Sequence, residues 1–278
     1  MKSYKISVII PVYNEEKYIA DCLYSFNNQT LQPSEVIVVD DGSTDNSKYI
    51  IYNLKFKINN LKYVRQKHSG PAKARNMGSR YAKGNILVFV DADMKFDKKY
   101  LENLTKPIRT DHALATFTKE EYVANPESVW SRCWSINSYL PDFLHIDPNT
   151  GSMADNFRAI RHDIFQKTEG YKDIGYGEDV TVLAQLKGVR AKAAPFAICY
   201  HFNPSTLAEV FFSARWIGKS YKKNIKHFLI YSFPNTLRKG VIGAIKNRLP
   251  EYLIFKFVFD FGIAVGQLQS LLGGGYAK

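Results

Sequence analysis

The sequence contains little cysteine: among its 278 residues are only Cys22, Cys133 and Cys199, and no two of them form a CxxC pair. Such a sparse set argues against a disulfide framework. A positively charged leader followed by a long apolar stretch is also missing before Ile6. We therefore expect a cytoplasmic protein whose thiols are reduced.

Acidic residues are missing from a long stretch of the C-terminal quarter. Residues 210–250 contain no Asp or Glu, and the whole chain has a net charge of +12. The basic residues of this stretch are Arg215, Lys219, Lys222, Lys223, Lys226, Arg238, Lys239, Lys246 and Arg248. A block of like charge commonly faces an anionic surface, either nucleic acid or lipid head groups, and it is equally compatible with a merely solvated face.

A long uninterrupted apolar run is missing as well. The most apolar C-terminal segment, YLIFKFVFDFGIAVGQLQSLL, is broken by Lys256 and Asp260. A spanning helix needs about 20 consecutive apolar residues, so we do not expect this segment to cross a membrane. Residues 206–278 should form a basic, aromatic helical region that either packs on the rest of the chain or lies in a membrane interface. Of these two we favour peripheral association with the cytoplasmic face of a membrane.

Strand and helix patterns alternate in the first half of the chain. Short apolar runs rich in Val and Ile lie at 6–10, 35–39 and 85–90, and they predict buried parallel strands. Apolar residues at helical spacing predict helices over 16–27 and 71–83. The alternation predicts a doubly wound, mostly parallel α/β sheet flanked by helices. Folds of this class bind ligands beyond the carboxyl ends of their strands.

Acidic side chains follow the predicted strands at the points where the strands end. The first strand runs into the loop PVYNEE, the second ends in Asp40 and Asp41, and another ends in Asp91 and Asp93. These strand ends should meet at one edge of the sheet. Capping or turn formation is the ordinary role of such acids. A position directly after a buried apolar strand favours a functional role, because a carboxylate there has little structural use unless it meets something polar or cationic.

Four stretches of the sequence share the pattern of one enzyme family. They are SVIIPVYNEEKYIADCLYSFNNQT, EVIVVDDGSTDNS, GPAKARNMGSRYAKGNILVFVDADM and GYGEDVTVLAQLKGVRAKAAP, in this order from about Ser7 to His201. In these stretches the chain resembles the family 2 glycosyltransferases, an inverting group with the GT-A fold. The resemblance implies a catalytic domain over residues 1–205, with a nucleotide-binding half at 1–100 and an acceptor-binding half at 101–205. A C-terminal helical extension would follow.

The resemblance also implies a reaction and a metal. A sugar would pass from a UDP- or GDP-linked donor to a hydroxyl of a lipid-linked or glycan acceptor, and a divalent cation, Mn²⁺ or Mg²⁺, would neutralise the departing diphosphate. The family pattern places Asp93 on the metal, Asp91 on the ribose or a metal-bound water, and His201 near the metal or diphosphate. The alternatives are a turn acid, a cap acid and a structural histidine that follows a strand expected at 194–199.

By the same resemblance, a set of residues would bind the donor nucleotide. They are Pro11, Tyr13, Glu15, Asp41, Arg75, Asp91, Ala92, Arg215 and Lys219. Tyr13 offers a ring or a hydroxyl to the base, and Asp41 can accept a hydrogen bond from a base N–H. Arg75 suits phosphate or ribose oxygens, with a surface salt bridge as the alternative. Glu15 is also compatible with a first-turn helix acid, and Arg215 and Lys219 with a helix face toward solvent.

The segment GYGEDVTV supplies a pair of adjacent acids. Direct displacement at the anomeric carbon needs one base that takes the proton of the acceptor hydroxyl. The family pattern assigns this role to Asp179, with Glu178 orienting the acceptor or a neighbouring base. The segment is also a predicted helix start, where acids are electrostatically favourable without any catalysis.

Three other classes of protein share parts of this pattern. A phospho-receiver domain carries similar acids, but its acid pair follows the first strand and its chain is shorter. A sugar nucleotidyltransferase is chemically closest, yet the glycine-rich phosphate loop expected near its N-terminus is missing. A basic nucleic-acid-binding protein would leave the acidic strand ends unexplained, and no base-reading motif is present. We therefore expect a GT-A transferase with no nucleic-acid partner and keep the last two classes as alternatives.

Overall fold

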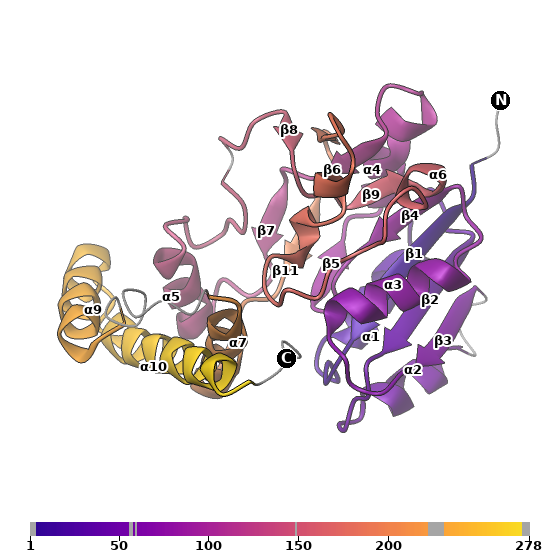
Figure 1. Ribbon diagram of the computed structural model, residues 1–278. Helices are drawn as coiled ribbons and strands as arrows, with labels where there is room; N and C mark the ends of the chain where they lie inside the picture. The colour runs from indigo at the N-terminus through magenta and orange to yellow at the C-terminus, as the bar shows by residue number, and fades with distance from the viewer. Residues whose placement is uncertain (1–3, 56–57, 59, 148, 222–230, 274–278) are drawn as a thin grey trace. The chain divides into compact units, whose positions relative to one another are not determined.

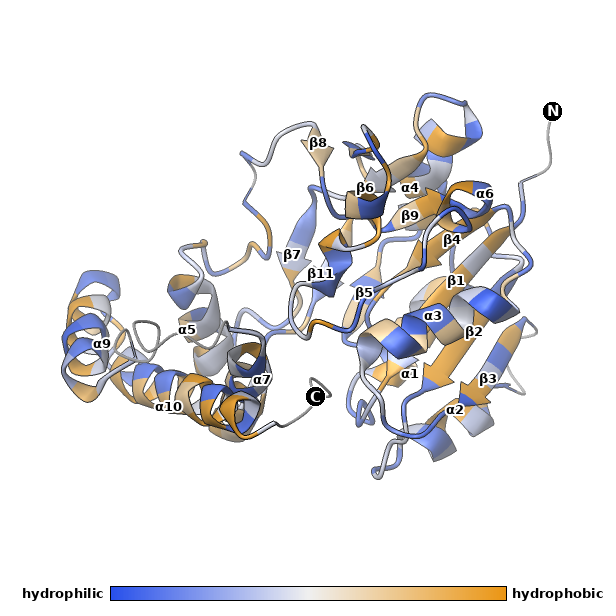
Figure 2. Ribbon diagram, in the orientation of Figure 1, coloured by the Kyte–Doolittle hydropathy of each residue, from blue (hydrophilic) through white to orange (hydrophobic). Residues whose placement is uncertain are grey.

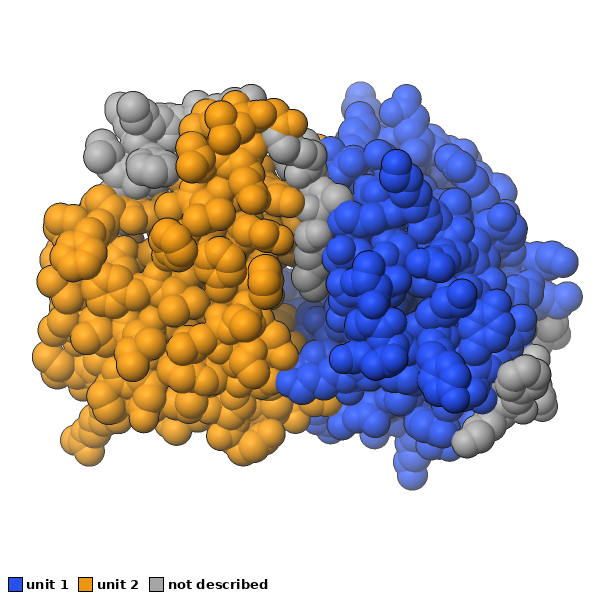
Figure 3. Space-filling model, turned by 90° about the horizontal axis from the view of Figure 1, so that it is seen from below, with its two compact units in different colours: residues 1–122, 146–173, 178–201 blue, residues 123–145, 174–177, 202–278 orange. Residues whose placement is uncertain are grey.

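The computed structural model describes residues 4–55, 58, 60–147, 149–221 and 231–273. The chain folds into two compact units (Figure 3). Unit 1 comprises residues 1–122, 146–173 and 178–201, and unit 2 comprises residues 123–145, 174–177 and 202–278.

Unit 1 is built on a mostly parallel sheet flanked by helices, which confirms the predicted fold class. Within the described residues this sheet has eight strands in the order β3-β2-β1-β4-β9-β6-β10-β8 (Figure 1). The strands are β1 Ile6–Val12, β2 Glu35–Asp40, β3 Leu61–Arg65, β4 Ile86–Phe89, β6 Ala115–Phe117, β8 Met153–Ala154, β9 Ala159–Arg161 and β10 Ala191–Ala193. Strand β1 is parallel to β2 and β4, whereas β9 is antiparallel to β4 and β6. The carboxyl ends of β1, β2 and β4 therefore lie along one edge.

Helices cover both faces of the central strands. They are α1 Ile19–Asn27, α2 Ser47–Lys55, α3 Pro71–Tyr81, α4 Tyr100–Arg109 and α6 His162–Phe165. On one face Val8 and Ile10 share an apolar core with residues of α1, α2 and α4, and on the other Ile9 shares a core with residues of α3. Every residue of β2 and β4 is buried. Burial on both faces explains why these strands are continuous apolar runs, as Figure 2 shows.

The first predicted helix begins three residues later than expected, at Ile19. The chain before it is a loop in which Asn14 has a φ of 56°. The backbone N–H of Glu15 donates to Ser47 Oγ at 2.8 Å, and the N–H of Glu16 donates to an oxygen of Asp45 at 3.0 Å. These bonds tie the loop after β1 to the loop after β2, so residues 16–18 are not available to the helix.

A second, smaller sheet brings distant segments together. Among the described residues it consists of β5 Met94–Phe96, β11 Cys199–His201 and β7 Glu121–Val123, in the order β5-β11-β7. Strand β11 is antiparallel to β5, so that His201 lies opposite Met94. The prediction of a strand at 194–199 is wrong. The chain bends at Phe196, whose φ is 61°, and the strand begins only at Cys199.

Unit 2 is helical, as the prediction of a C-terminal helical extension requires. Its helices are α5 Val129–Asn137, α7 Leu207–Ser220, α9 Phe233–Asn247 and α10 Glu251–Leu271. Helices α7 and α10 meet backbone to backbone. A Cβ atom on Gly266 would lie 2.0 Å from the carbonyl oxygen of Arg215, and one on Gly262 would lie 2.7 Å from that of Phe211. Glycine is therefore required at this crossing, because any side chain would force the helices apart.

Helix α10 buries the two charges that interrupt its apolar sequence. Lys256 Nζ and Asp260 Oδ1 form an ion pair at 2.7 Å, and both side chains are almost fully buried. Asp260 also accepts a hydrogen bond from Thr236 Oγ1 at 2.6 Å, and Lys256 donates to Asn137 Oδ1 at 3.1 Å. Of the described helices, α10 alone is long and apolar enough to cross a membrane by length and composition, and half of that stretch is buried inside the protein.

Candidate active site

Asp91 follows β4 at the predicted edge of the sheet and is held by two arginines. Its Oδ1 accepts a hydrogen bond from Arg75 Nη2 at 2.7 Å, and its Oδ2 accepts one from Arg158 Nη1 at 2.9 Å. Burial by itself would raise the pKa of Asp91, but the charges of Arg158 and Arg75 lower this pKa well below its ordinary range. Asp91 is therefore ionised at neutral pH.

Arg75 joins Asp91 to the acid pair of the GYGEDVTV segment. Its Nη1 donates to Glu178 Oε1 at 2.5 Å and lies 3.7 Å from Asp179 Oδ1. The residue is only 6% exposed. The burial rules out the surface salt bridge considered as the alternative for Arg75, and its contact to phosphate or ribose stays a prediction. In the structure the guanidinium balances and positions carboxylates.

The two acids of that pair differ in their access to solvent. Glu178 is 3% exposed, whereas the side chain of Asp179 is 46% exposed. Burial raises the pKa of Glu178, although the charge of Arg75 acts in the opposite direction. The helix predicted to start here is a three-residue 3₁₀ turn, Glu178–Val180, and the Glu178 carboxylate bonds Arg75 instead of capping it. Of the two acids, Asp179 is therefore the one that is accessible from solvent.

A second cluster of acids surrounds His201. Its Nε2 lies 3.2 Å from Asp93 Oδ1, and its Nδ1 lies 2.9 Å from Glu121 Oε1. The pairing of β11 with β5 and with β7 creates this arrangement. Burial by itself would lower the pKa of His201, but Asp93 and Glu121 raise it well above its ordinary value.

The donor set of this cluster fits a divalent cation. Asp93 offers a carboxylate oxygen directly beside the Nε2 atom of His201. The Glu121 carboxylate contacts the other ring nitrogen, Nδ1. A carboxylate in this position is the usual outer partner of a metal-bound histidine. The predicted ligands Asp93 and His201 thus lie together, whereas the Asp91 carboxylate is engaged by two arginines.

Arg158 connects the two clusters, because its Nη2 lies 3.4 Å from Glu121 Oε2 while its Nη1 holds Asp91. Sequence reasoning missed both Arg158 and Glu121. Arg158 lies in the segment GSMADNFRAI, where a basic residue between apolar ones was the available signal. Glu121 sits in KEEYV, which matches no motif, so only the pairing of β7 reveals it.

The acids at the end of β2 have structural partners. Asp41 accepts hydrogen bonds from Gln66 Nε2 at 2.6 Å and from the backbone N–H groups of Ser69 and Gly70, each at 2.8 Å. Asp40 Oδ2 accepts a hydrogen bond from the hydroxyl of Tyr63 at 2.6 Å. Asp41 therefore organises the loop before α3, and direct recognition of a base by this carboxylate would displace one of its donors.

The loop after β1 presents an aromatic surface beside Asp41. The ring of Tyr13 stacks on that of His68 with centroids 3.9 Å apart and an interplanar angle of 20°. His68 Nδ1 lies 2.9 Å from Asp41 Oδ2. Sequence reasoning missed His68. Pro11 pairs with the end of β2 through its register with Val39.

The remaining predicted site residues of unit 1, Glu15 and Ala92, have mainly local structural roles. Glu15 is half-buried in the loop that precedes α1, and its backbone N–H is fixed by Ser47. Ala92 is 3% exposed and belongs to the apolar core, so the backbone between Asp91 and Asp93 is firmly held.

Arg215 and Lys219 both lie on α7 in unit 2. The guanidinium of Arg215 lies 5.2 Å from the ring centroid of Phe212. Burial, followed by the nearby charge of Arg215, lowers the pKa of Lys219. Their expected contact with the diphosphate stays a prediction.

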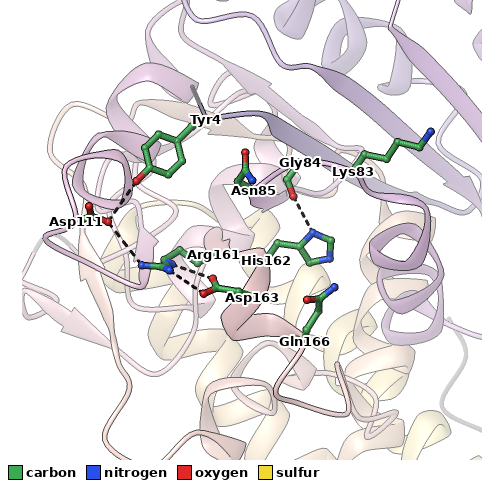
Figure 4. Close-up of a pocket in the computed structure, with 9 residues that line it drawn as sticks. All are labelled: Tyr4, Lys83, Gly84, Asn85, Asp111, Arg161, His162, Asp163 and Gln166. Atoms are coloured by element: carbon green, nitrogen blue, oxygen red, sulfur yellow. Dashed lines mark hydrogen bonds and ion pairs between the residues drawn. The ribbon is translucent and has the colours of Figure 1, made fainter. Parts of the chain in front are cut away.

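A cavity of about 500 Å³ opens at the opposite edge of the sheet, near the amino ends of β1 and β4 (Figure 4). Its charged residues already engage one another: Arg161 pairs with Asp163 at 2.8 Å and lies 3.8 Å from Asp111. His162 Nδ1 lies 2.8 Å from the carbonyl oxygen of Gly84. We assign no ligand to this cavity.

Solved structures resemble the whole chain at low sequence identity. A mannosyltransferase from Pyrobaculum calidifontis, solved with GDP-Man and Mn²⁺, has a TM-score of 0.62 at 18% identity and covers 98% of this chain and 88% of its own. Staphylococcus aureus TarS has a TM-score of 0.56 at 21% identity and covers 95% of this chain and 55% of its own. These likenesses confirm the predicted GT-A fold.

Curated relatives match over the N-terminal part of the sequence. The glycosyltransferase GlyA of Streptococcus pneumoniae is 41% identical over 104 residues, which cover 37% of this chain and 15% of GlyA. GlyG of the same organism is 38% identical over 109 residues, which cover 39% of this chain and 36% of GlyG. The match thus spans about a third or less of either relative. A profile of Glycosyl transferase family 2 matches residues 7–168, more than half of the sequence. The chain belongs to family 2 of the glycosyltransferases.

Proposed function

We propose that this chain transfers a sugar from a nucleotide-sugar donor, linked to UDP or GDP, to a hydroxyl of a lipid-linked or glycan acceptor. The observation that carries the proposal is the network of ion pairs around Asp91, which follows β4 at the carboxyl edge of the sheet. Its members are Glu178, Asp179, Arg75, Asp91, Arg158, Glu121, His201 and Asp93. The network holds an accessible acid and a candidate metal pair within one set of ion pairs, which suits a reaction that moves both a proton and an anionic leaving group.

The proposed reaction is a single displacement. The acceptor hydroxyl attacks the anomeric carbon, the bond from this carbon to the diphosphate oxygen breaks, and its electron pair leaves with the diphosphate. One displacement inverts the configuration at the anomeric carbon. Asp179 receives the proton of the attacking hydroxyl. Glu178 acts through Arg75, whose guanidinium fixes the position of Asp179 from 3.7 Å.

The donor would bind along the loops after β1 and β2. We propose that Tyr13, stacked on His68, receives the base, and that Pro11, Glu15 and Asp41 shape this pocket. Asp93 and His201 would hold the divalent metal, Mn²⁺ or Mg²⁺. When bound, such a metal neutralises charge on the departing diphosphate. Asp91 would face the ribose while its arginines keep it ionised.

The place of the enzyme in the cell is part of the same proposal. We propose a cytoplasmic protein, associated peripherally with the cytoplasmic face of a membrane, in which residues 1–205 carry out catalysis. Lys222, Lys223 and Lys226, which belong to the basic stretch, lie outside the described residues. The relatives support the donor class, since TarS was solved with UDP-GlcNAc and the Pyrobaculum enzyme with GDP-Man.

A thermal-shift panel tests this function. UDP, GDP and their sugars, each with Mn²⁺ or Mg²⁺, should raise the melting temperature, because ligand binding stabilises by RT ln(1 + [L]/Kd). Asp93→Asn should fold normally and lose the metal-dependent part of the shift. Asp163→Asn, at the opposite sheet edge, serves as the control. Metal-dependent affinity that is unchanged in Asp93→Asn by calorimetry would remove Asp93 from the metal site.

A further inference from the structure

Unit 2 contains a large cavity with surplus positive charge. The cavity has a volume of about 810 Å³ and is lined by residues of α5, α9 and α10. Arg238, Lys239 and Lys246 of α9 line it, and no carboxylate among the described residues pairs with them. The wall also contains Asp142, but this acid is engaged by Arg132 at 2.8 Å. The cavity therefore offers three cations to an anion that the described chain does not supply.

Tyrosines form much of the remaining wall. They are Tyr139, Tyr221, Tyr231 and Tyr252. Tyrosine presents an apolar ring and a hydroxyl that donates hydrogen bonds. Phosphate oxygens accept strong hydrogen bonds from Lys, Arg and such hydroxyls. The chemistry of the wall therefore suits a phosphate group that is joined to something apolar.

Beside the cavity, α9 exposes a stripe of apolar side chains. Phe233, Leu237, Val241 and Ile245 follow one another at intervals of four residues, with exposed fractions of 69%, 39%, 39% and 73%. Residues four apart lie on one side of a helix. Ile242, which is 55% exposed, also lines the cavity. Ile242 follows Val241 in the sequence and therefore lies about 100° further around the helix. The apolar stripe is thus adjacent to the cavity wall.

We propose that this face of unit 2 binds a membrane lipid that carries a phosphate group. The phosphate lies in the cavity against Lys239, Lys246 and Arg238, and the hydrocarbon lies over the apolar stripe. A soluble nucleotide would leave the stripe exposed to water, and an apolar protein partner would bury cations without counter-ions. A phospholipid satisfies both surfaces at once, as basic amphipathic helices do in membrane interfaces. Because this lipid is proposed as a partner of the transferase, the proposal rests on the proposed function.

The charged half of the site is tested with a monomeric probe. Titration calorimetry with short-chain phosphatidic acid below its micelle concentration should detect binding to the full chain. Each lysine beside an anionic surface is worth about fivefold in affinity, so Lys239→Gln/Lys246→Gln should bind about 30-fold more weakly. The control Lys98→Gln/Lys99→Gln removes the same charge from exposed positions of unit 1 and should bind as the wild type does. Equal binding by both double variants overturns the proposal.

The apolar half is tested with vesicles. The protein should sediment with vesicles of phosphatidylcholine mixed with phosphatidylglycerol and stay in solution with phosphatidylcholine alone. Leu237→Gln/Ile245→Gln should lose this sedimentation, whereas Tyr49→Ser, an exposed aromatic of unit 1, should keep it. Wild-type protein that remains in the supernatant at low salt overturns the proposal.

A further arm separates a lipid from free phosphate. Inorganic pyrophosphate is titrated as a second probe, and Leu237→Gln/Ile245→Gln is tested with both probes. If pyrophosphate binds as tightly as the short-chain lipid and the variant changes neither affinity, the cavity is a site for free phosphate and the lipid proposal is overturned. The thermal shift with UDP or GDP is measured on the same variants. Lipid binding that persists without any nucleotide shift refutes the proposed transferase and leaves the lipid site standing.

Discussion

Removal of the Arg75 side chain should destabilise the fold in a pH-dependent manner. Arg75→Met keeps an unbranched side chain in the buried site but deletes the hydrogen bonds to Asp91 and Glu178, at 2.7 Å and 2.5 Å. Asp91 retains Arg158, whereas Glu178, which is 3% exposed, loses its hydrogen-bonded cation. A buried carboxylate that has lost its partner costs about 3–5 kcal/mol in the free energy of unfolding.

Protonation of Glu178 limits this cost. With an ordinary pKa of about 4.3, protonating a glutamate costs about 3.7 kcal/mol at pH 7 and about 1 kcal/mol at pH 5. Burial already raises the folded-state pKa of Glu178, and loss of Arg75 raises it further. An acid whose pKa is higher in the folded state binds more protons there, so stability falls as pH rises above the unfolded pKa. The loss caused by Arg75→Met should therefore be small at pH 5 and several-fold larger at pH 7.

Urea denaturation at the two pH values measures this difference. The wild type and Arg80→Met, an exposed arginine on the same helix, provide the references. The double variant Arg75→Met/Glu178→Gln has no carboxylate to protonate at position 178, so its loss of stability should be similar at both pH values and smaller at pH 7 than that of Arg75→Met. An equal loss at pH 5 and pH 7 in Arg75→Met, without recovery in the double variant, would refute the assignment of the charge pair.

Two further predictions concern the base and the helix crossing. Asp179→Asn should lower turnover at least ~100-fold with little change in donor affinity, because the base acts on the acceptor hydroxyl; near-normal turnover on saturating acceptor would move the role elsewhere. Gly266→Ala should lower the free energy of unfolding by about 1–3 kcal/mol, since its Cβ would lie 2.0 Å from the carbonyl oxygen of Arg215. Gly151→Ala, whose Cβ meets only one atom at 3.9 Å, is the control, and equal denaturation midpoints would contradict the close crossing.

The parallel part of the fold could be predicted from the sequence because its signals are local. Continuous Val and Ile runs mark strands that are buried on both faces, and the structure places β1, β2 and β4 on those runs. The boundaries of the elements were harder to predict from the sequence. The backbone N–H groups of Glu15 and Glu16 donate to Ser47 and Asp45, which delays the start of α1 to Ile19, and such tertiary contacts leave no periodic pattern.

The acids of the site could be predicted because they follow strands in recognisable motifs. Their partners could not. Arg158 directly precedes the short strand β9 and Glu121 begins the short strand β7, neither in a motif, and only the pairing of those strands brings them to Asp91 and His201. The carboxylate partners of Arg75 could not be predicted for the same reason, since Glu178 is 103 residues away in the sequence.

That separation has a consequence for the order in which the chain matures during synthesis. Chains emerge from the ribosome N-terminal end first, and long-range contacts form only after both partners have emerged. The strands β1, β2 and β4 can associate once about the first 90 residues are free. Arg75 can bond Glu178 only after another 103 residues have been made, and Glu121 can contact His201 only after another 80. A nascent chain therefore has the strand ends of the proposed nucleotide site before Asp179, the proposed base, and His201, a proposed metal ligand, have emerged, so the proposed activity would be the last property that unit 1 acquires.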